Sequence, residues 1–474
     1  MDPLFLLAIG MLLVLGSILL LRLHPFLALF LGALIVAWLT PRANIEEYAL
    51  AAGMTSEQAL SLSRQWVGQR LAMGFGDTCA KIGLLIALAS VIGKALLESG
   101  AADRIVRTAL RLLGDKRAPL AFLGSGFTLG IPVYFDTVFY LLIPLAKSMG
   151  IRNERRYLLY VLSTIVGATM AHSLVPPTPG PLFVARALNV DVGAMMLGGV
   201  IVGAVTVAFG FLYALWASHR WPVPLRDSVD MSLSDLRALM EREDAELPPF
   251  WLAILPILLP VALIAGRTIT AIAVGAESAQ TSVLRFVANV GDPNIALTIA
   301  AGIALVTLAL QKRPDRKAFG ETIHSALAGA GMIIIITASG GAFGDVLQQT
   351  GVGTRIQLLA MDYRISVLPL AFLVTALVRT AQGSATVAMI TAVGILAGFA
   401  EPSTLGFHPL YLALAIGCGS KPFPWMNDSG FWIVARMSGF TDRETLKTHS
   451  IALSGMGVIG IVVVMILARL FPMV

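Results

Sequence analysis

Long apolar segments recur from one end of the chain to the other, and short charged stretches separate them. The hydrophobic fraction is 57% and the charged fraction is 13%, whereas a soluble domain carries about 25% charged residues. Inside a bilayer every backbone polar group must be hydrogen-bonded within the protein, so such segments fold as helices. The sequence therefore predicts an all-α polytopic membrane protein. Its spans are expected at 4–21, 25–40, 71–97, 157–187, 192–217, 249–268, 292–310, 321–348, 408–436 and 449–470.

The apolar segment 118–146 is interrupted in its middle by a Gly-Ile-Pro run at 130–132, and it holds one carboxylate, Asp136. Glycine and proline break the helical hydrogen-bond ladder, and bare backbone at bilayer depth is tolerated only inside protein or along a wet cavity. Two interpretations follow. The segment is either a re-entrant hairpin of two half-helices, with Tyr134 and Asp136 near the turn, or one kinked span with a buried, paired Asp136.

An internal repeat favours the hairpin. PLAFL at 119–123 recurs at 369–373, and Val-Ala-Arg at 184–186 recurs at 434–436. Ordered matches at nearly one spacing indicate two related halves. A second re-entrant hairpin is therefore predicted at 366–397.

Loop charges orient the chain. If the N-terminus lies outside, the cytoplasmic loops hold 20 Lys and Arg residues and the outer segments, such as 41–70, hold 7. This bias matches the positive-inside rule. The first hairpin then enters from the cytoplasm and the second from outside, so the halves are inverted-topology repeats. Such repeats with broken helices are a signature of secondary transporters, whose substrate site lies near the midplane.

The expected organisation follows from this topology. An amphipathic interfacial helix is predicted at 101–113 and a short polar helix from Ser234 onward. The first predicted units are N-terminal spans (1–70) and a first repeat (71–190), which contains hairpin 118–146 and broken helix 157–187. Connecting spans follow (191–320), with a cytoplasmic loop at 218–248. The last units are a second repeat (321–437), which contains hairpin 366–397 and broken helix 408–436, and a C-terminal span (438–474).

Polar groups gather where the helices are predicted to break. AHSLVPPTPGP at 171–181 and GCGSKPFPWMNDSGF at 417–431 cannot sustain a helix. Unwound carbonyls suit cations or hydroxyls, and half-helix N-termini suit anions. The second hairpin tip, RTAQGSATVA at 379–388, offers a carboxylate site on a helix N-terminus. The predicted substrate-binding residues are Tyr134, Asp136, Thr137, His172, Ser173, Thr178, Arg379, Gly383, Ser384, Thr386, Lys421, Asn427, Asp428 and Ser429.

Charged side chains inside a membrane are costly and so are functional candidates. Arg379 either pairs with a substrate carboxylate or forms a fixed salt bridge with Asp136 or Asp428. Lys421 either attracts an anion or snorkels to an interface, and we favour snorkelling. Asp136, His172 and Asp428 are candidate proton carriers. The alternatives are a helix cap for either carboxyl group and a packed ring for His172.

Several other classes of protein are not supported by the sequence. There is no phosphate-loop motif for a primary pump, and no paired-aspartate or serine-nucleophile signature for an intramembrane enzyme. The basic residues sit in loops and do not indicate nucleic-acid binding. Cys79 and Cys418 lie in or beside apolar segments, so neither a disulfide nor a metal site is expected, and no cofactor is implied. An enzyme or a channel remains a remote alternative.

An ordered set of motifs runs along the chain: GFGDTCAKIGLLIALASVIGKALLESGAADRI (74–105), IPVYFDTVFYLLIPL (131–145), PPTPGP (176–181), GSATVA (383–388), NDSGFW (427–432) and ETLKT (444–448). Together these motifs resemble the gluconate permease family of the ion transporter superfamily. The resemblance implies a bacterial inner-membrane, multi-pass proton symporter for gluconate or a related small sugar acid, with a periplasmic N-terminus here. A sodium-coupled carboxylate carrier and a D-serine-type carrier are the alternatives. The superfamily also implies a homodimer in which a mobile domain holding both hairpins moves like an elevator against a scaffold.

The chain departs from the usual family pattern at several positions. The family commonly has Glu at the place of Asp136, His at the place of Thr178 and an apolar residue at the place of Lys421. It also usually shows Ser-His-Val where this chain has Pro-Trp-Met at 424–426. These positions lie at the predicted site, so we expect them to affect substrate choice.

Overall fold

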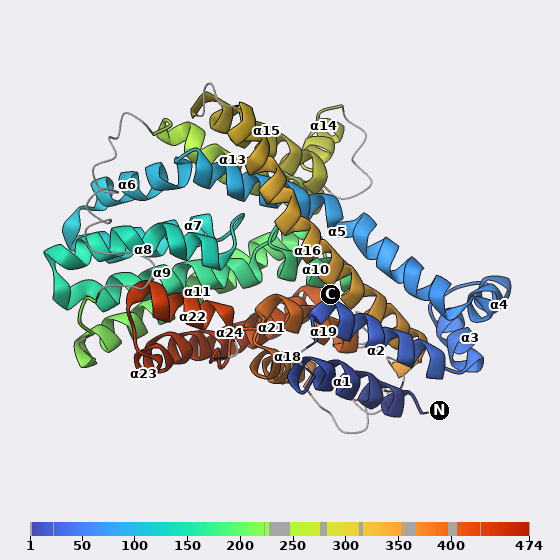
Figure 1. The fold of residues 1–474 in the computed structure, drawn as a ribbon. Helices are drawn as coiled ribbons and strands as arrows, with labels where there is room; N and C mark the ends of the chain where they lie inside the picture. The colour runs from blue at the N-terminus through green and yellow to red at the C-terminus, as the bar shows by residue number, and fades with distance from the viewer. Residues whose placement is uncertain are drawn as a thin grey trace.

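The fold is built of helices (Figure 1). The computed structural model describes residues 2–21, 23–221, 223–226, 247–274, 282–311, 316–352, 355, 366–396, 405–426 and 428–473. Every regular element in these ranges is helical, which confirms the predicted fold class. The first half holds α1 (Pro3–Leu19), α2 (Pro25–Leu39), α3 (Arg42–Ala51), α4 (Ser56–Arg64), α5 (Val67–Glu98), α6 (Ala101–Leu113), α7 (Ala118–Leu129), α8 (Phe135–Arg152), α9 (Tyr157–Leu174), α10 (Pro179–Ala187) and α11 (Val192–Arg220). The second half holds α13 (Phe250–Val274), α14 (Ser282–Val290), α15 (Pro293–Gln311), α16 (Arg316–Gln349), α18 (Val367–Gln382), α19 (Ala385–Leu396), α21 (Pro409–Gly419), α22 (Ser429–Ser438), α23 (Asp442–Thr445) and α24 (Ile451–Leu470).

Seven described helical segments are long and apolar enough to cross a membrane. They are α5, α9 with α10, α11, α13, α15, α16 and α23 through α24, and all seven coincide with spans predicted from the sequence. The other predicted spans contain shorter helices. α1 has 17 residues, α2 has 15 and α21 has 11. α2 meets α3 at a bend of 100°.

Two polar helices lie where only an outer segment was predicted. α3 and α4 both fall within 41–70, and α4 begins with a capping box between Thr55 and Gln58. No apolar run marks these helices, so hydropathy does not find them. The amphipathic helix predicted at 101–113 is present as α6. The polar helix predicted from Ser234 lies outside the described residues.

Both predicted hairpins are pairs of short helices that pack against each other. α7 and α8 have 12 and 18 residues, and α18 and α19 have 16 and 12. At 1.5 Å per residue, a 12-residue helix spans about 18 Å, well below the roughly 30 Å of a hydrocarbon core. The first pair breaks over 130–134 and the second at Gly383 and Ser384, where Gly383 has a φ of 83°. These lengths support re-entrant hairpins.

The helix that follows each hairpin is broken where the sequence predicted it. α9 ends at Leu174 and α10 begins at Pro179, while α21 and α22 are separated by residues 420–428. The order of long helix, hairpin, broken helix and long helix therefore occurs twice, as α5 to α11 and as α16 to α24. The inverted relation between these two sets stays a prediction.

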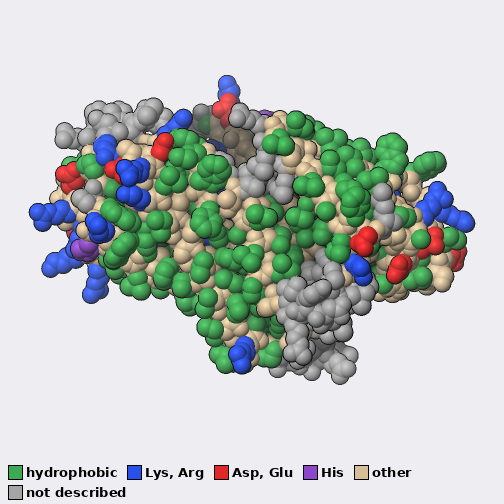
Figure 2. All heavy atoms as spheres, turned by 90° about the horizontal axis from the view of Figure 1, so that it is seen from below, with side chains coloured by type: hydrophobic (Ala, Val, Ile, Leu, Met, Phe, Trp, Pro, Cys, Tyr) green, Lys and Arg blue, Asp and Glu red, His purple; other side chains and the backbone are tan. Residues whose placement is uncertain are grey.

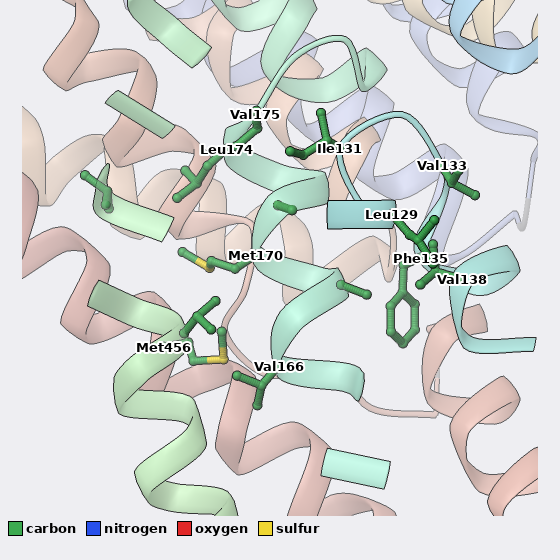
Figure 3. Packing of buried hydrophobic residues seen from close by; sticks show 14 of the residues in the cluster. Leu129, Ile131, Val133, Phe135, Val138, Val166, Met170, Leu174, Val175 and Met456 are labelled. Carbon is green, nitrogen blue, oxygen red and sulfur yellow. The ribbon is translucent and has the colours of Figure 1, made fainter. Parts of the chain in front are cut away.

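The first hairpin is fixed in place by close packing on α9. A Cβ on Gly167 of α9 would lie 2.2 Å from the carbonyl oxygen of Leu123 in α7, so the two backbones touch at this glycine. Figure 3 shows the tip residues Ile131 and Phe135 among the buried residues that also include Met170 of α9. The hairpin tip is thus held in the core by apolar contacts.

The face of the molecule in Figure 2 carries a broad band of hydrophobic side chains, and most of the charged side chains on this face gather toward its two ends. Figure 1 places α3 and α4 at one end and α23 at the opposite end. The predicted topology also puts these two regions on opposite sides of a membrane. A hydrophobic band of this kind is the surface that a bilayer would cover.

Candidate functional site

A cavity of about 370 Å³ lies where the broken elements meet. The tips of both hairpins, α9, the start of α10 and the break between α21 and α22 all contribute to its wall, with α16 and the start of the last span closing it. The predicted site residues that line the cavity are Tyr134, Asp136, His172, Arg379, Gly383, Ser384, Thr386, Lys421, Asp428 and Ser429. Segments far apart in the sequence are therefore brought to one place.

Four helices begin at this cavity. Residues at the starts of α8, α10, α19 and α22 all line it. The first N–H groups of a helix have no partner within the helix, and they carry partial positive charge. No side-chain cap satisfies the start of α8, whereas Asp428 caps α22 by accepting from Gly430 N at 2.8 Å. The start of α10 offers fewer donors, because Pro179 and Pro181 have no backbone N–H. The wall therefore favours negative charge.

Arg379 and Asp428 form a buried ion pair that ties the second hairpin to the α21–α22 break. The Arg379 guanidinium contacts the Asp428 carboxylate, donates through Nη1 to the carbonyl of Gly383, and donates through Nε to the carbonyl of Ser420 at 3.1 Å. Of the two interpretations open from the sequence, the structure shows the fixed salt bridge, with Asp428 as the partner. Asp428 also caps the start of α22, which is the role that the sequence left open as the alternative to a proton carrier.

Lys421 is buried and its ammonium faces the cavity. Its Nζ donates to the carbonyl of Thr169 at 2.6 Å, and no described residue forms an ion pair with it. The expectation that Lys421 snorkels to an interface is therefore wrong. The reason is its position in an unwound break that α24 covers, where a Cβ on Gly457 would lie 3.1 Å from the Cβ of Lys421.

The carboxylate of Asp136 also faces the cavity, one residue after the start of α8. In the described part of the chain it has neither an ion pair nor a hydrogen bond. His172 lies close by, with its ring edge-on to Tyr134 at 5.8 Å between centroids, and its Nδ1 is buried without a hydrogen-bond partner. Asp136 and His172 are thus free of fixed partners at these atoms, in contrast to Asp428.

Sequence reasoning missed one titratable residue of the cavity, His449. It is buried, its ring stacks on Phe135 at 6.4 Å, and both of its ring nitrogens lack hydrogen-bond partners. The search for charged groups covered the hairpins and broken spans, and His449 lies at the start of the last span, just after the ETLKT motif. The missed uncharged polar residues of the wall are Thr169, Thr337 and Ser420.

Some predicted site residues do not line this cavity. Thr137 and Ser173 neighbour residues that do line it, but they lie on other faces of α8 and α9. Thr178 donates to the carbonyls of His172 and Val175, each at 2.8 Å, and so stabilises the break. Asn427 lies outside the described residues. Among the described residues, no group of three His, Cys, Asp or Glu side chains is placed to hold a metal ion.

These features define a class of protein. Seven candidate spans, paired short hairpins and broken helices around a buried polar cavity are the architecture of a secondary membrane transporter. The family model described as GntP family permease matches residues 3–470, and the chain belongs to this family. The predicted resemblance is therefore confirmed.

Relatives of this chain that carry a functional name are also transporters. The chain is 31% identical to the gluconate permease of Pseudomonas aeruginosa over 449 residues, covering 94% of this chain and 93% of the relative. It is also 31% identical to a high-affinity gluconate transporter of Escherichia coli K12 over 463 residues, covering 97% and 98%. These relatives are permeases and transporters, as expected for a chain that is not an enzyme.

A solved structure shares the fold. The YdaH transporter of Alcanivorax borkumensis, whose structure is described as having an unusual topology, matches with a TM-score of 0.59 and 14% sequence identity. The match covers 85% of this chain and 88% of that one. At this identity the likeness concerns the fold alone.

Proposed function

We propose that this protein is a proton-coupled symporter that carries gluconate or a related small sugar acid across a bacterial inner membrane. The observation that carries the proposal is the buried cavity in which the Lys421 ammonium has no ion-pair partner among the described residues. A buried charge is costly unless it is paired. A substrate carboxylate would supply the missing partner.

The rest of the wall suits a polyhydroxy acid. The start of α19 offers backbone N–H groups beside the hydroxyls of Ser384 and Thr386, and Ser429 adds another hydroxyl from α22. Helix N-termini bind carboxylates well, and hydroxyl groups of the wall can exchange hydrogen bonds with those of a sugar acid. The cavity volume of about 370 Å³ is in the range of small-molecule sites.

We assign the binding of the co-transported proton to Asp136. It has no fixed partner in the described part of the chain, whereas Asp428 is held by Arg379 and by its own helix N-terminus. A proton on Asp136 would offset the charge of a bound carboxylate, so that substrate and proton cross the low-dielectric region together at lower cost. His172 and His449 would pass the proton through their unpartnered nitrogens.

The same framework suggests how the carrier moves. We propose a homodimer with a periplasmic N-terminus, in which the segment 1–70 belongs to a static scaffold. The repeats 71–190 and 321–437, with their hairpins and broken helices, would form the moving part. Because Lys421 of the second repeat donates to the carbonyl of Thr169 in the first, these parts would move as one body.

Uptake into proteoliposomes tests the function. Labelled gluconate, related aldonates and uronates, D-serine and a dicarboxylate would each be offered with an inward proton gradient, with and without sodium. We expect saturable gluconate uptake that a protonophore abolishes and that does not need sodium. Uptake that follows the sodium gradient, or uptake of D-serine alone, would replace the proposed coupling or substrate. Current without saturable uptake would indicate a channel and contradict the proposal.

A further inference from the structure

A second polar cavity, of about 250 Å³, lies beside the first, and none of the predicted site residues lines it. Its wall comes from α3, α5, α10, α16 and α19. Asp77, Lys81 and Asn189 line it and are exposed, so it opens to the surface of the molecule. The segments at its mouth belong to the side that the sequence predicts to be periplasmic.

The two cavities follow one another along the same helices. On α10, Pro179 lines the first cavity and Phe183 the second. On α16, Thr337 lines the first and Gly341 the second. Four residues of helix correspond to about 6 Å. The cavities are therefore about one helical turn apart, and α19 borders both of them as well.

On α19, an apolar stretch lies between Val387, which lines the first cavity, and Val393, which lines the second. Met389 and Ile390 of α19 are fully buried and pack against two glycines. A Cβ on Gly180 would lie 2.0 Å from Cε of Met389, and a Cβ on Gly340 would lie 1.8 Å from Cγ2 of Ile390. The two side chains thus fill the space that the glycines leave.

Most charges of the second cavity have a counterpart of opposite sign nearby. Asp345 accepts from Gln349 at 2.9 Å, and Gln349 accepts from Arg70 at 2.8 Å, so a hydrogen-bonded chain joins a carboxylate to a guanidinium. Asp77 and Lys81 lie one turn apart on α5, where opposite charges are neighbours.

Arg186 is the charged side chain of the second cavity that has no such counterpart of opposite sign. It projects into the second cavity from α10, and no described residue forms an ion pair or hydrogen bond with it. Its Nε is buried without a hydrogen-bond partner. The charged side chains that line the second cavity are Asp77, Lys81, Arg186 and Asp345, so their formal charges sum to zero. Among them, Arg186 carries planar donors that match a carboxylate.

We propose that the second cavity is a capture site for a carboxylate, bound by the Arg186 guanidinium. From there the anion passes into the first cavity when Met389 and Ile390 move aside. The inference rests on the proposed function and deepens it, because it gives each chain two carboxylate sites in series.

Equilibrium binding of labelled gluconate to the purified, full-length protein tests the proposal. We expect two gluconate molecules per wild-type chain, one in Arg186→Gln and one in Lys421→Met. Arg436→Gln is the matched control, because Arg436 ends the repeated Val-Ala-Arg motif but is exposed and lines neither cavity, and it should still bind two. Arg186→Lys keeps the charge and should keep measurable binding at the second site.

Transport gives an independent readout. Arg186→Gln should raise KM for external gluconate about tenfold while the maximal rate stays within about twofold, because only capture is impaired. A single wild-type site that Lys421→Met abolishes and Arg186→Gln leaves intact would overturn the second site and preserve the proposed function. A folded wild-type protein that binds no gluconate would overturn both.

Discussion

Lys421 and Asp136 are the two charged side chains of the first cavity that have no ion-pair partner among the described residues. Arg379 and Asp428 neutralise each other and hold backbone groups. The sequence marked all four as costly intramembrane charges but could not tell which would pair, because pairing depends on how two breaks far apart in the chain meet. The structure thereby separates a structural pair from two groups that are free for substrate and proton.

Replacing Lys421 by methionine should raise KM for gluconate about 10- to 100-fold, since a hydrogen bond to a charged group contributes about 1.5–3 kcal/mol. Methionine keeps the length of the side chain and removes the ammonium. Uptake into proteoliposomes at several gluconate concentrations measures the effect. Lys447→Met removes an exposed lysine outside the cavity and should leave KM unchanged. An unaltered KM in Lys421→Met would remove Lys421 from the substrate site.

Replacing Asp136 by asparagine should separate transport from proton coupling. Asparagine cannot take up the proton, so accumulation driven by a pH gradient should be lost while exchange of labelled for unlabelled gluconate continues. Both rates can be measured in the same proteoliposomes. The control is Asp442→Asn, an exposed carboxylate at the start of α23. Normal pH-driven accumulation in Asp136→Asn would assign the proton to another group.

At the scale of elements, the two hairpins are held in position by two different kinds of contact. Polar contacts from Arg379 join the second hairpin to the α21–α22 break, whereas bare backbone contact at Gly167 holds the first hairpin on α9. The breaks themselves were visible in the sequence because proline and glycine interrupt a helix wherever they fall. The contacts between the breaks were not visible, since they join residues that lie 41 and 49 positions apart in the chain.

Loss of the buried ion pair should destabilise the second hairpin. Arg379→Gln leaves Asp428 as an uncompensated buried charge, which costs about 3–5 kcal/mol in measured cases. The thermal midpoint of the purified protein in detergent should fall clearly. Arg469→Gln, at an exposed position near the C-terminus, should not change the midpoint. Equal midpoints for the two variants would show that the pair does not hold the hairpin.

Adding one methyl group at the α7–α9 contact should also be costly. In Gly167→Ala the new Cβ has to push Leu123 away, and overpacking of this kind costs about 1–3 kcal/mol. Gly124→Ala on the same hairpin meets no atom within 4 Å and should be neutral or slightly stabilising. Thermal unfolding of the two variants compares them. If Gly167→Ala is as stable as Gly124→Ala, the close approach does not position the hairpin.

At the scale of the whole molecule, the sequence predicted the helical class, the helix pairs of both hairpins, both helix breaks and ten spans, seven of which coincide with helices long enough to cross a membrane. Hydropathy and helix-breaking residues are local signals. The sequence missed α3 and α4, which are polar, and His449, which belongs to no broken element. It also could not decide which face of a helix meets the cavity, so Thr137 and Ser173 were included although they point elsewhere. Such facts depend on packing between distant segments.

The most direct test of the central claim is accumulation of gluconate by the wild-type protein under an imposed pH gradient. Proteoliposomes with an alkaline interior and no sodium gradient should concentrate labelled gluconate above the external level, and a protonophore should release it. Coupled transport of a sugar acid and a proton by this protein predicts this result. Gluconate that only equilibrates across the membrane, whatever the pH gradient, would contradict proton coupling.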